Sequence, residues 1–87
     1  MSIDAEALKR AFPTHTEDEL VEFRLDEQLE KYIGEVVLRE FRGVSVSERQ
    51  KRIWDRLRED FNSDSQMVSI VFAFSPEEWQ DMKDEVA

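Results

Sequence analysis

A cluster of basic side chains is the strongest chemical feature of this 87-residue chain. Residues 39–58 contain seven basic and three acidic residues, a net charge of +4, whereas the whole chain carries −9. Guanidinium groups bind carboxylates and phosphates through paired hydrogen bonds, so this segment could bind an acidic protein surface or a nucleic acid. The candidate side chains are Arg42 and, on a predicted helix, Arg49, Lys51, Arg52 and Arg56.

The sequence lacks the sets of residues that nucleophilic catalysis, thiol redox chemistry and metal binding require. The chain has no cysteine, and its one histidine, His15, lies in a polar segment where we expect it to be solvated. Carboxylates are plentiful, for example in residues 17–19 and 77–78, but no nucleophile–base pair or phosphate-binding loop accompanies them. We therefore expect no enzyme activity, no catalytic residue, no metal site and no cofactor.

Two alternatives to a protein-binding surface exist for the basic segment. In the first, its four helical members contact the phosphates of a nucleic acid. The charge of −13 on the rest of the chain and the absence of a GxxG loop weigh against this alternative. In the second, the basic side chains only solvate a helix and pair with acids such as Glu48, Asp55 and Glu59.

Length and composition favour one small domain, residues 1–87. No stretch approaches the about 18 consecutive apolar residues of a membrane span, and residues 1–10 lack the features of a signal peptide. We expect a cytoplasmic protein that is a monomer or a weak homodimer and does not bind membranes.

The N-terminal half predicts one helix and two strands. Apolar residues at helical spacing from Ile3 to Phe12, after a Ser2 cap, indicate a helix that the following proline ends. Alternation over residues 20–25 and β-branched residues over 35–41 indicate two antiparallel strands. The residues between these strands form either a connector or a short helical turn that ends at Gly34.

A capping box begins the helix that carries most of the basic residues. Gly43 allows a turn, Ser45 can accept from an early amide, and Glu48 can reach back. These residues predict a helix over 46–61, with an apolar stripe that includes Ile53 facing the core.

The C-terminal part predicts an apolar strand followed by a last helix. Residues 67–74 are the most apolar strand, which we expect to be central in the sheet. One of its faces carries Val68, Ile70, Phe72 and Phe74. Ser75 and Pro76 then begin a helix, in which Trp79, Met82 and Val86 should point inward.

These elements predict an α+β fold in the order helix, strand, strand, helix, an optional extra helix, strand, helix. A three-stranded mixed sheet with helices packed on one face is the simplest arrangement. The last two strands should be parallel, because a helix connects them.

The chain resembles the BolA-like family over nearly its whole length. The resemblance rests on EALKRAFP at residues 6–13, on Phe41-Arg42-Gly43 with Ser45 and Arg49, and on SPEEW at residues 75–79. It implies a fold similar to a type II KH domain. It also implies partnership with monothiol glutaredoxins in iron–sulfur homeostasis, or a role in transcription regulation.

Departures from the family pattern indicate a divergent member without cluster ligands. The family's histidine at the start of the last strand falls here on Met67, and its loop ligand falls in residues 26–34, which hold neither His nor Cys. A thioether is a poor substitute for imidazole at an iron–sulfur centre. We therefore expect a regulatory or adaptor protein without cofactor, which binds a monothiol glutaredoxin-like protein or another partner through the basic helix 46–61, Arg42 and the region of Met67.

Overall fold

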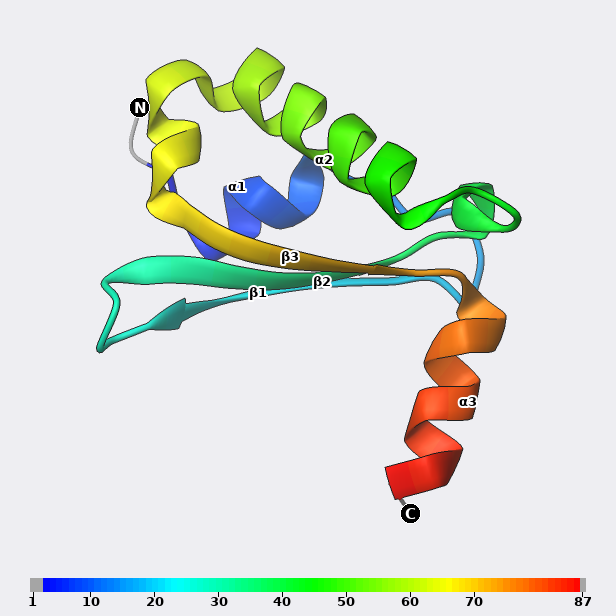
Figure 1. Ribbon diagram of the computed structural model, residues 1–87. Coiled ribbons are helices and arrows are strands. Elements are labelled where there is room, and N and C mark those ends of the chain that lie inside the picture. Colours follow the sequence, from blue (N-terminus) through cyan, green and yellow to red (C-terminus); the bar gives the residue numbers. More distant parts are fainter. Residues whose placement is uncertain (1–2, 87) are drawn as a thin grey trace.

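A three-stranded sheet with two helices over one face forms the body of the molecule (Figure 1). The computed structural model describes residues 3–86, the last of these by its backbone alone. The α+β class and the predicted order of elements are confirmed. In chain order the elements are α1 Ala5–Arg10, β1 Leu20–Asp26, β2 Lys31–Val37, the 3-10 turn η1 Arg39–Phe41, α2 Val46–Phe61, the 3-10 segment η2 Asn62–Met67, β3 Val68–Phe74 and α3 Pro76–Val86.

Side-chain caps fix where the helices begin. Asp4 accepts from the amide of Ala7 at 2.8 Å, so α1 begins at Ala5. The expected Ser2 cap lies outside the described residues. Ser45 accepts from the amide of Glu48 at 3.2 Å, which confirms the predicted start of α2. At α3 the capping box is complete, as described with the site below.

The hairpin between β1 and β2 is tighter than the sequence indicated. The two strands pair antiparallel, as predicted, from Leu20 opposite Val37 to Asp26 opposite Lys31. The prediction of a strand over residues 35–41 is wrong, because β2 begins at Lys31 after a four-residue turn. Asp26 stabilises that turn by accepting from the amides of the second and third residues after it, at 3.0 and 3.1 Å.

Gly34 lies within β2 rather than at the end of a helical turn. It is directly opposite Phe23 of β1, and a Cβ atom built on Gly34 would overlap the ring of Phe23. The absence of a side chain at Gly34 therefore lets this ring lie flat over the sheet beneath α1, where it stacks with Phe12.

The central strand of the sheet is β2, with β1 on one side and β3 on the other. The predicted parallel pairing of the last two strands is confirmed, because β2 pairs parallel with β3. The expectation that β3 is central is wrong. Its high apolar content instead reflects two apolar faces, of which only one is covered.

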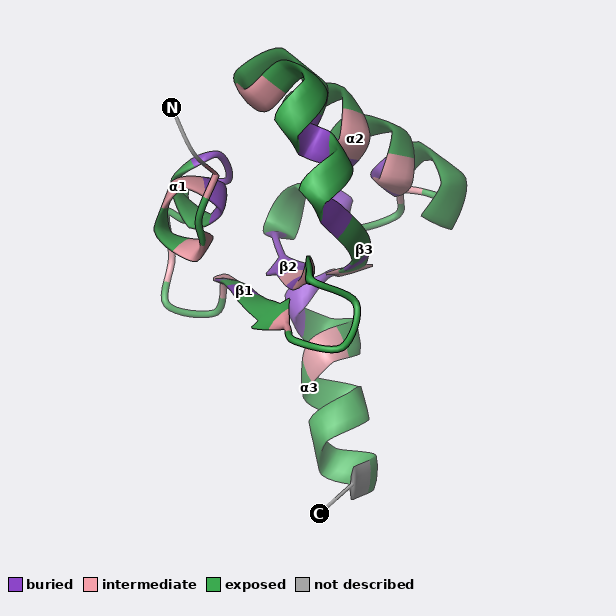
Figure 2. Cartoon of the chain, turned by 90° about the vertical axis from the view of Figure 1, so that its left-hand side faces the viewer, coloured by how far each residue is buried: buried purple, intermediate pink, exposed green. Residues whose placement is uncertain are grey.

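The core fills the space between the sheet and the two helices α1 and α2 (Figure 2). Fully buried side chains come from both layers, including Leu8, Val36, Ile53 and Leu57. On the far side, α3 leaves the end of β3 and points away from the face that α1 and α2 cover (Figure 1). Contact between the rings of Trp79 and Phe74, 5.5 Å apart, attaches α3 to that side.

The inward-facing residues expected on α3 are only partly covered. Trp79 is half-buried and Met82 is exposed, while the side chain of Val86 lies outside the described residues. A helix with so little apolar contact depends on the bonds at its start for its position.

A register irregularity divides the apolar residues of β3 between two faces. The pairing shifts between Tyr32 and Ile33, so the predicted grouping of Val68 with Ile70 is wrong. Val68 and Val71 are buried under α2, whereas Ile70 and Phe72 remain 43% and 44% exposed. We call the side chains of Ile70, Phe72 and Phe74, which α1 and α2 leave uncovered along the free edge of the sheet, the open face of β3.

Candidate functional site

Arg49 is a buried structural residue, which removes it from the predicted binding surface. Only 6% of it is exposed, and its Nε donates to the carbonyl of Val44 at 2.8 Å. Nη1 donates to the carbonyl of Ala73 at 3.2 Å and to Oε1 of Glu78 at 2.6 Å. The guanidinium also lies 5.9 Å from the ring centroid of Phe41. Arg49 therefore joins the turn before α2, the end of β3 and the start of α3.

Glu78 completes this junction from α3. Its Oε1 accepts from the amide of Ser75 at 2.8 Å, while the hydroxyl of Ser75 accepts from the amide of Glu78 at 3.3 Å. The hydrogen bond from Arg49 and the bond from the Ser75 amide lower the pKa of Glu78 from its ordinary 4.5 to about 2. The expected cap at Ser75 is thus confirmed, and the same carboxylate also binds the buried arginine.

The lowered pKa of Glu78 makes the free energy of unfolding depend on pH. Because the folded pKa of Glu78 lies below the unfolded one, its contribution is present above about pH 4.5 and is lost as the pH falls toward 2. The side chain is half exposed, so solvent screening weakens the effect. We expect the ionised Glu78 to contribute about 1 kcal/mol to the free energy of unfolding. In urea unfolding at pH 7 and pH 3, the Glu78→Gln variant should lose less stability on acidification than the parent; an equal loss would contradict the role of this carboxylate.

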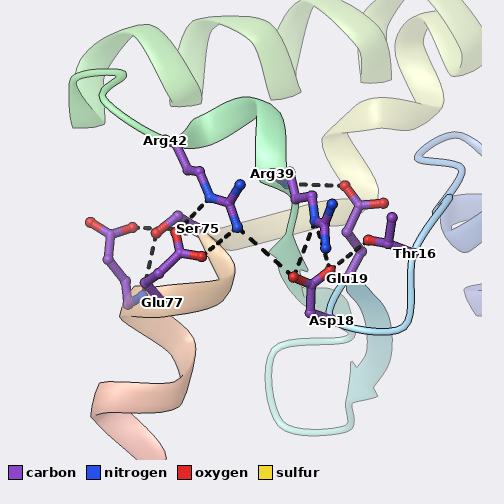
Figure 3. Close-up of polar contacts among 8 residues, drawn as sticks. Thr16, Asp18, Glu19, Arg39, Arg42, Ser75 and Glu77 are labelled. Carbon is purple, nitrogen blue, oxygen red and sulfur yellow. Dashed lines mark hydrogen bonds and ion pairs between the residues drawn. The ribbon is translucent and has the colours of Figure 1, made fainter.

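Arg42 belongs to a second ionic cluster at the same end of the sheet (Figure 3). Its Nε and Nη2 donate to the two oxygens of Glu77 at 2.6 and 2.5 Å, and Asp18 lies 3.9 Å away. Nε of Arg39 donates to Asp18 at 3.0 Å, and Asp18 also accepts from the hydroxyl of Thr16. Hydrogen bonds from Arg39 and then Thr16 lower the pKa of Asp18, and the bond from Arg42 lowers that of Glu77.

The exposed bases of α2 are paired to different degrees. Lys51 and Arg58 both donate to Asp55, at 3.0 and 2.9 Å. Arg56 donates to the carbonyl of Ala11 at 2.7 Å, which connects α2 to the end of α1. Among residues 3–86, Arg52 has only long ion pairs, at 3.9 Å to Glu40 and 3.6 Å to Glu48. Most of the predicted positive charge is therefore satisfied within the molecule.

The predicted site residues do not form one surface. Met67 precedes β3 and is 40% exposed, whereas Arg42 contacts Glu77 beyond the other end of that strand. Seven residues of β3 separate the two, a span of about 20 Å at ~3.3 Å per residue. Met67 and Arg42 therefore cannot act on the same small group.

An apolar groove at the edge of β3 is the feature that the sequence reasoning missed. It has a volume of about 360 Å³ and lies between the start of α2 and β3. Val46, which is 73% exposed, contributes one wall, and Ile70 and Phe72 contribute the other. The alternation of large apolar residues along β3 is the signal for this groove in the sequence, but the same alternation also fits a central strand.

Gln50 and Arg49 cover the backbone along this groove. Nε2 of Gln50 donates to the carbonyl of Val71 at 2.8 Å, while its Oε1 accepts from the indole of Trp54 at 3.1 Å. Arg49 bonds to the carbonyl of Ala73. Because two carbonyls of β3 are already bound by side chains, addition of a partner strand at this edge is disfavoured. A partner would therefore contact side chains rather than backbone.

We searched the described part of the chain for clusters of metal-ligating side chains and for helices that could span a membrane. Within residues 3–86, no group of three or more His, Cys, Asp or Glu side chains could hold a metal ion. Over the same range, no helix is long and apolar enough to cross a membrane.

Comparison with known proteins provides no relative: no family model, no curated protein and no solved structure matches the chain. The resemblance to the BolA-like family thus stays a prediction, based on the residues quoted for it. The properties of the site follow from its own geometry.

Proposed function

We propose that this chain is a non-enzymatic adaptor of the BolA-like type, which binds a partner protein through the apolar groove beside β3. The observation that carries the proposal is the exposure of Ile70 and Phe72 on the open face, at 43% and 44%. Side chains two residues apart on a strand lie on the same face, so the two form a continuous apolar surface. Exposed apolar patches beside polar residues are typical of protein interfaces.

The charge of the molecule favours a protein over a nucleic acid as the partner. The net charge is −9, and three exposed bases of α2, Lys51, Arg56 and Arg58, already donate to acids or to a carbonyl. Phosphate contacts would have to replace these bonds against a negative background. The apolar groove needs no such exchange, because burial of Phe72 against a partner is favourable in itself.

A monothiol glutaredoxin-like protein is the partner that the BolA-like resemblance supports. Met67 stands where the family has a cluster-ligating histidine, so we propose direct apolar contact without a shared iron–sulfur cluster. The exposed thioether of Met67 near the start of β3 could extend that contact, because methionine adapts its shape to a partner.

Binding of a monothiol glutaredoxin from the same host, measured by calorimetry, tests the proposal. We expect Phe72→Ser to weaken binding about ten-fold or more, because a central aromatic contact is lost. The matched control is Leu29→Ser, which alters a side chain that is 56% exposed in the hairpin turn and should leave the affinity unchanged.

Two results would contradict this proposal. The first is an unchanged affinity of the Phe72→Ser variant together with loss of binding in an Arg52→Glu/Arg56→Glu variant, which would place the interface on the basic helix. The second is no binding of the glutaredoxin but salt-dependent binding of DNA or RNA, with a log–log slope near −4 for about four phosphate contacts.

A further inference from the structure

A pocket with an apolar floor and a basic rim lies on the other side of α2 from the groove of β3. Its volume is about 250 Å³, and it is bounded by the chain after α1, by η1 and by the middle of α2. Phe12, Phe41 and Ile53 line it, and each belongs to the core, with 5%, 2% and 0% exposure. The apolar surface that a ligand can reach in the pocket therefore comes from the exposed Pro13 and from the small exposed parts of Phe12 and Phe41, with Ile53 buried behind them.

The size of this pocket limits what it can hold. Drug-sized ligands occupy about 300–1,000 Å³, so a volume of about 250 Å³ fits a smaller molecule. A single ring or a short branched chain would fill the apolar part.

Two arginines one helical turn apart supply positive charge at the rim. Arg52 and Arg56 are at positions i and i+4 of α2, where like charges repel. Arg56 is held by its bond to the carbonyl of Ala11. Arg52 has no hydrogen bond among the described residues, and its nearest carboxylates are 3.6 and 3.9 Å away. Its donors are therefore available, and an anion at this point would relieve the repulsion.

The two acidic side chains of the rim, Glu19 and Glu40, differ in how firmly they are held. Glu19 accepts from the amide of His15 at 2.7 Å and from that of Arg39 at 3.0 Å, which fixes it in the wall. These two bonds lower its pKa. Glu40 lies 3.9 Å from Arg52, a distance at which a ligand carboxylate could replace it.

We propose that this pocket binds a small monocarboxylate with an apolar body, such as an aromatic or branched-chain acid. The carboxylate binds the guanidinium of Arg52, and the apolar body contacts Pro13 and the exposed parts of Phe12 and Phe41. This site is separate from the groove of β3, so its failure would leave the proposed adaptor function standing.

Phenylacetate and its neutral analogue phenylacetamide are the probes that test this site, by NMR titration of the full ¹⁵N-labelled chain. We expect saturable shifts from phenylacetate at the amides of residues 11, 12, 14 and 15, and of residues 38–41 and 52–56. Phenylacetamide should bind about ten-fold more weakly, because it cannot form the charge-assisted bonds to Arg52.

Two variants distinguish this site from general charge attraction. Arg52→Gln should abolish the preference for phenylacetate, whereas Arg58→Gln, the matched charge change outside the pocket, should retain it. The proposal is overturned if phenylacetate causes no saturable shift in these segments, if both probes bind equally to the parent chain, or if Arg52→Gln keeps the preference.

Discussion

Replacement of Arg49 by methionine should lower the free energy of unfolding by about 3 kcal/mol. The substitution keeps much of the apolar stem but leaves the carbonyls of Val44 and Ala73 without their buried donor. It also removes the partner of Glu78, so the start of α3 loses its anchor to α2. Urea unfolding at pH 7, followed by circular dichroism, measures the change.

The control for this prediction is Arg58→Met on the same helix. Arg58 is exposed and bonds only to Asp55 among the described residues, so its replacement should cost less than about 1 kcal/mol. Equal costs for the two variants would show that Arg49 is an ordinary surface arginine and is free to bind a partner.

Replacement of Gly34 by alanine should destabilise the protein by about 2–3 kcal/mol, the cost of overpacking a filled core. The added methyl group would overlap the ring of Phe23. Gly34 lies in the central strand and is paired on both sides, so its backbone cannot move away to relieve the overlap. Thermal and urea unfolding of the purified variant measure the loss.

The cause of this loss can be isolated with a second substitution. In a Phe23→Ala background the ring is gone, so Gly34→Ala should cost less than in the parent, which a double-mutant cycle reports as coupling. Gly43→Ala is the matched control: its φ of +69° is unfavourable for alanine, but no atom lies within 4 Å of the added carbon. Its cost of about 1 kcal/mol should not depend on Phe23, and absence of coupling at Gly34 would refute the steric explanation.

Local signals in the sequence were sufficient for the starts of α2 and α3. Ser45 and Ser75 each determine a helix start through bonds that span three residues, and the bounds of α2 match the predicted range 46–61. The hairpin turn has no glycine or asparagine, and Glu30 adopts a φ of 55° within it. For this reason the start of β2 was misplaced, although Asp26 was a usable signal for the turn.

Features that depend on distant parts of the chain could not be predicted in the same way. An apolar strand such as β3 has the same composition at the edge of a sheet as at its centre, and only its pairing with β2 decides between them. The burial of Arg49 depends on Glu78, 29 positions away, and on the carbonyl of Ala73. A helical arginine in a basic run therefore gave no sign that it was structural.

An NMR titration of the ¹⁵N-labelled chain with the host's monothiol glutaredoxin distinguishes the open face of β3 from the basic helix most directly. If the apolar groove binds the partner, amide signals of residues 70–74 and of Val46 should lose intensity first. Signals of residues 51–58, the segment of α2 that carries the exposed bases Lys51, Arg52, Arg56 and Arg58, should change little. Loss confined to residues 51–58, with the β3 signals unchanged, would contradict an interface at β3.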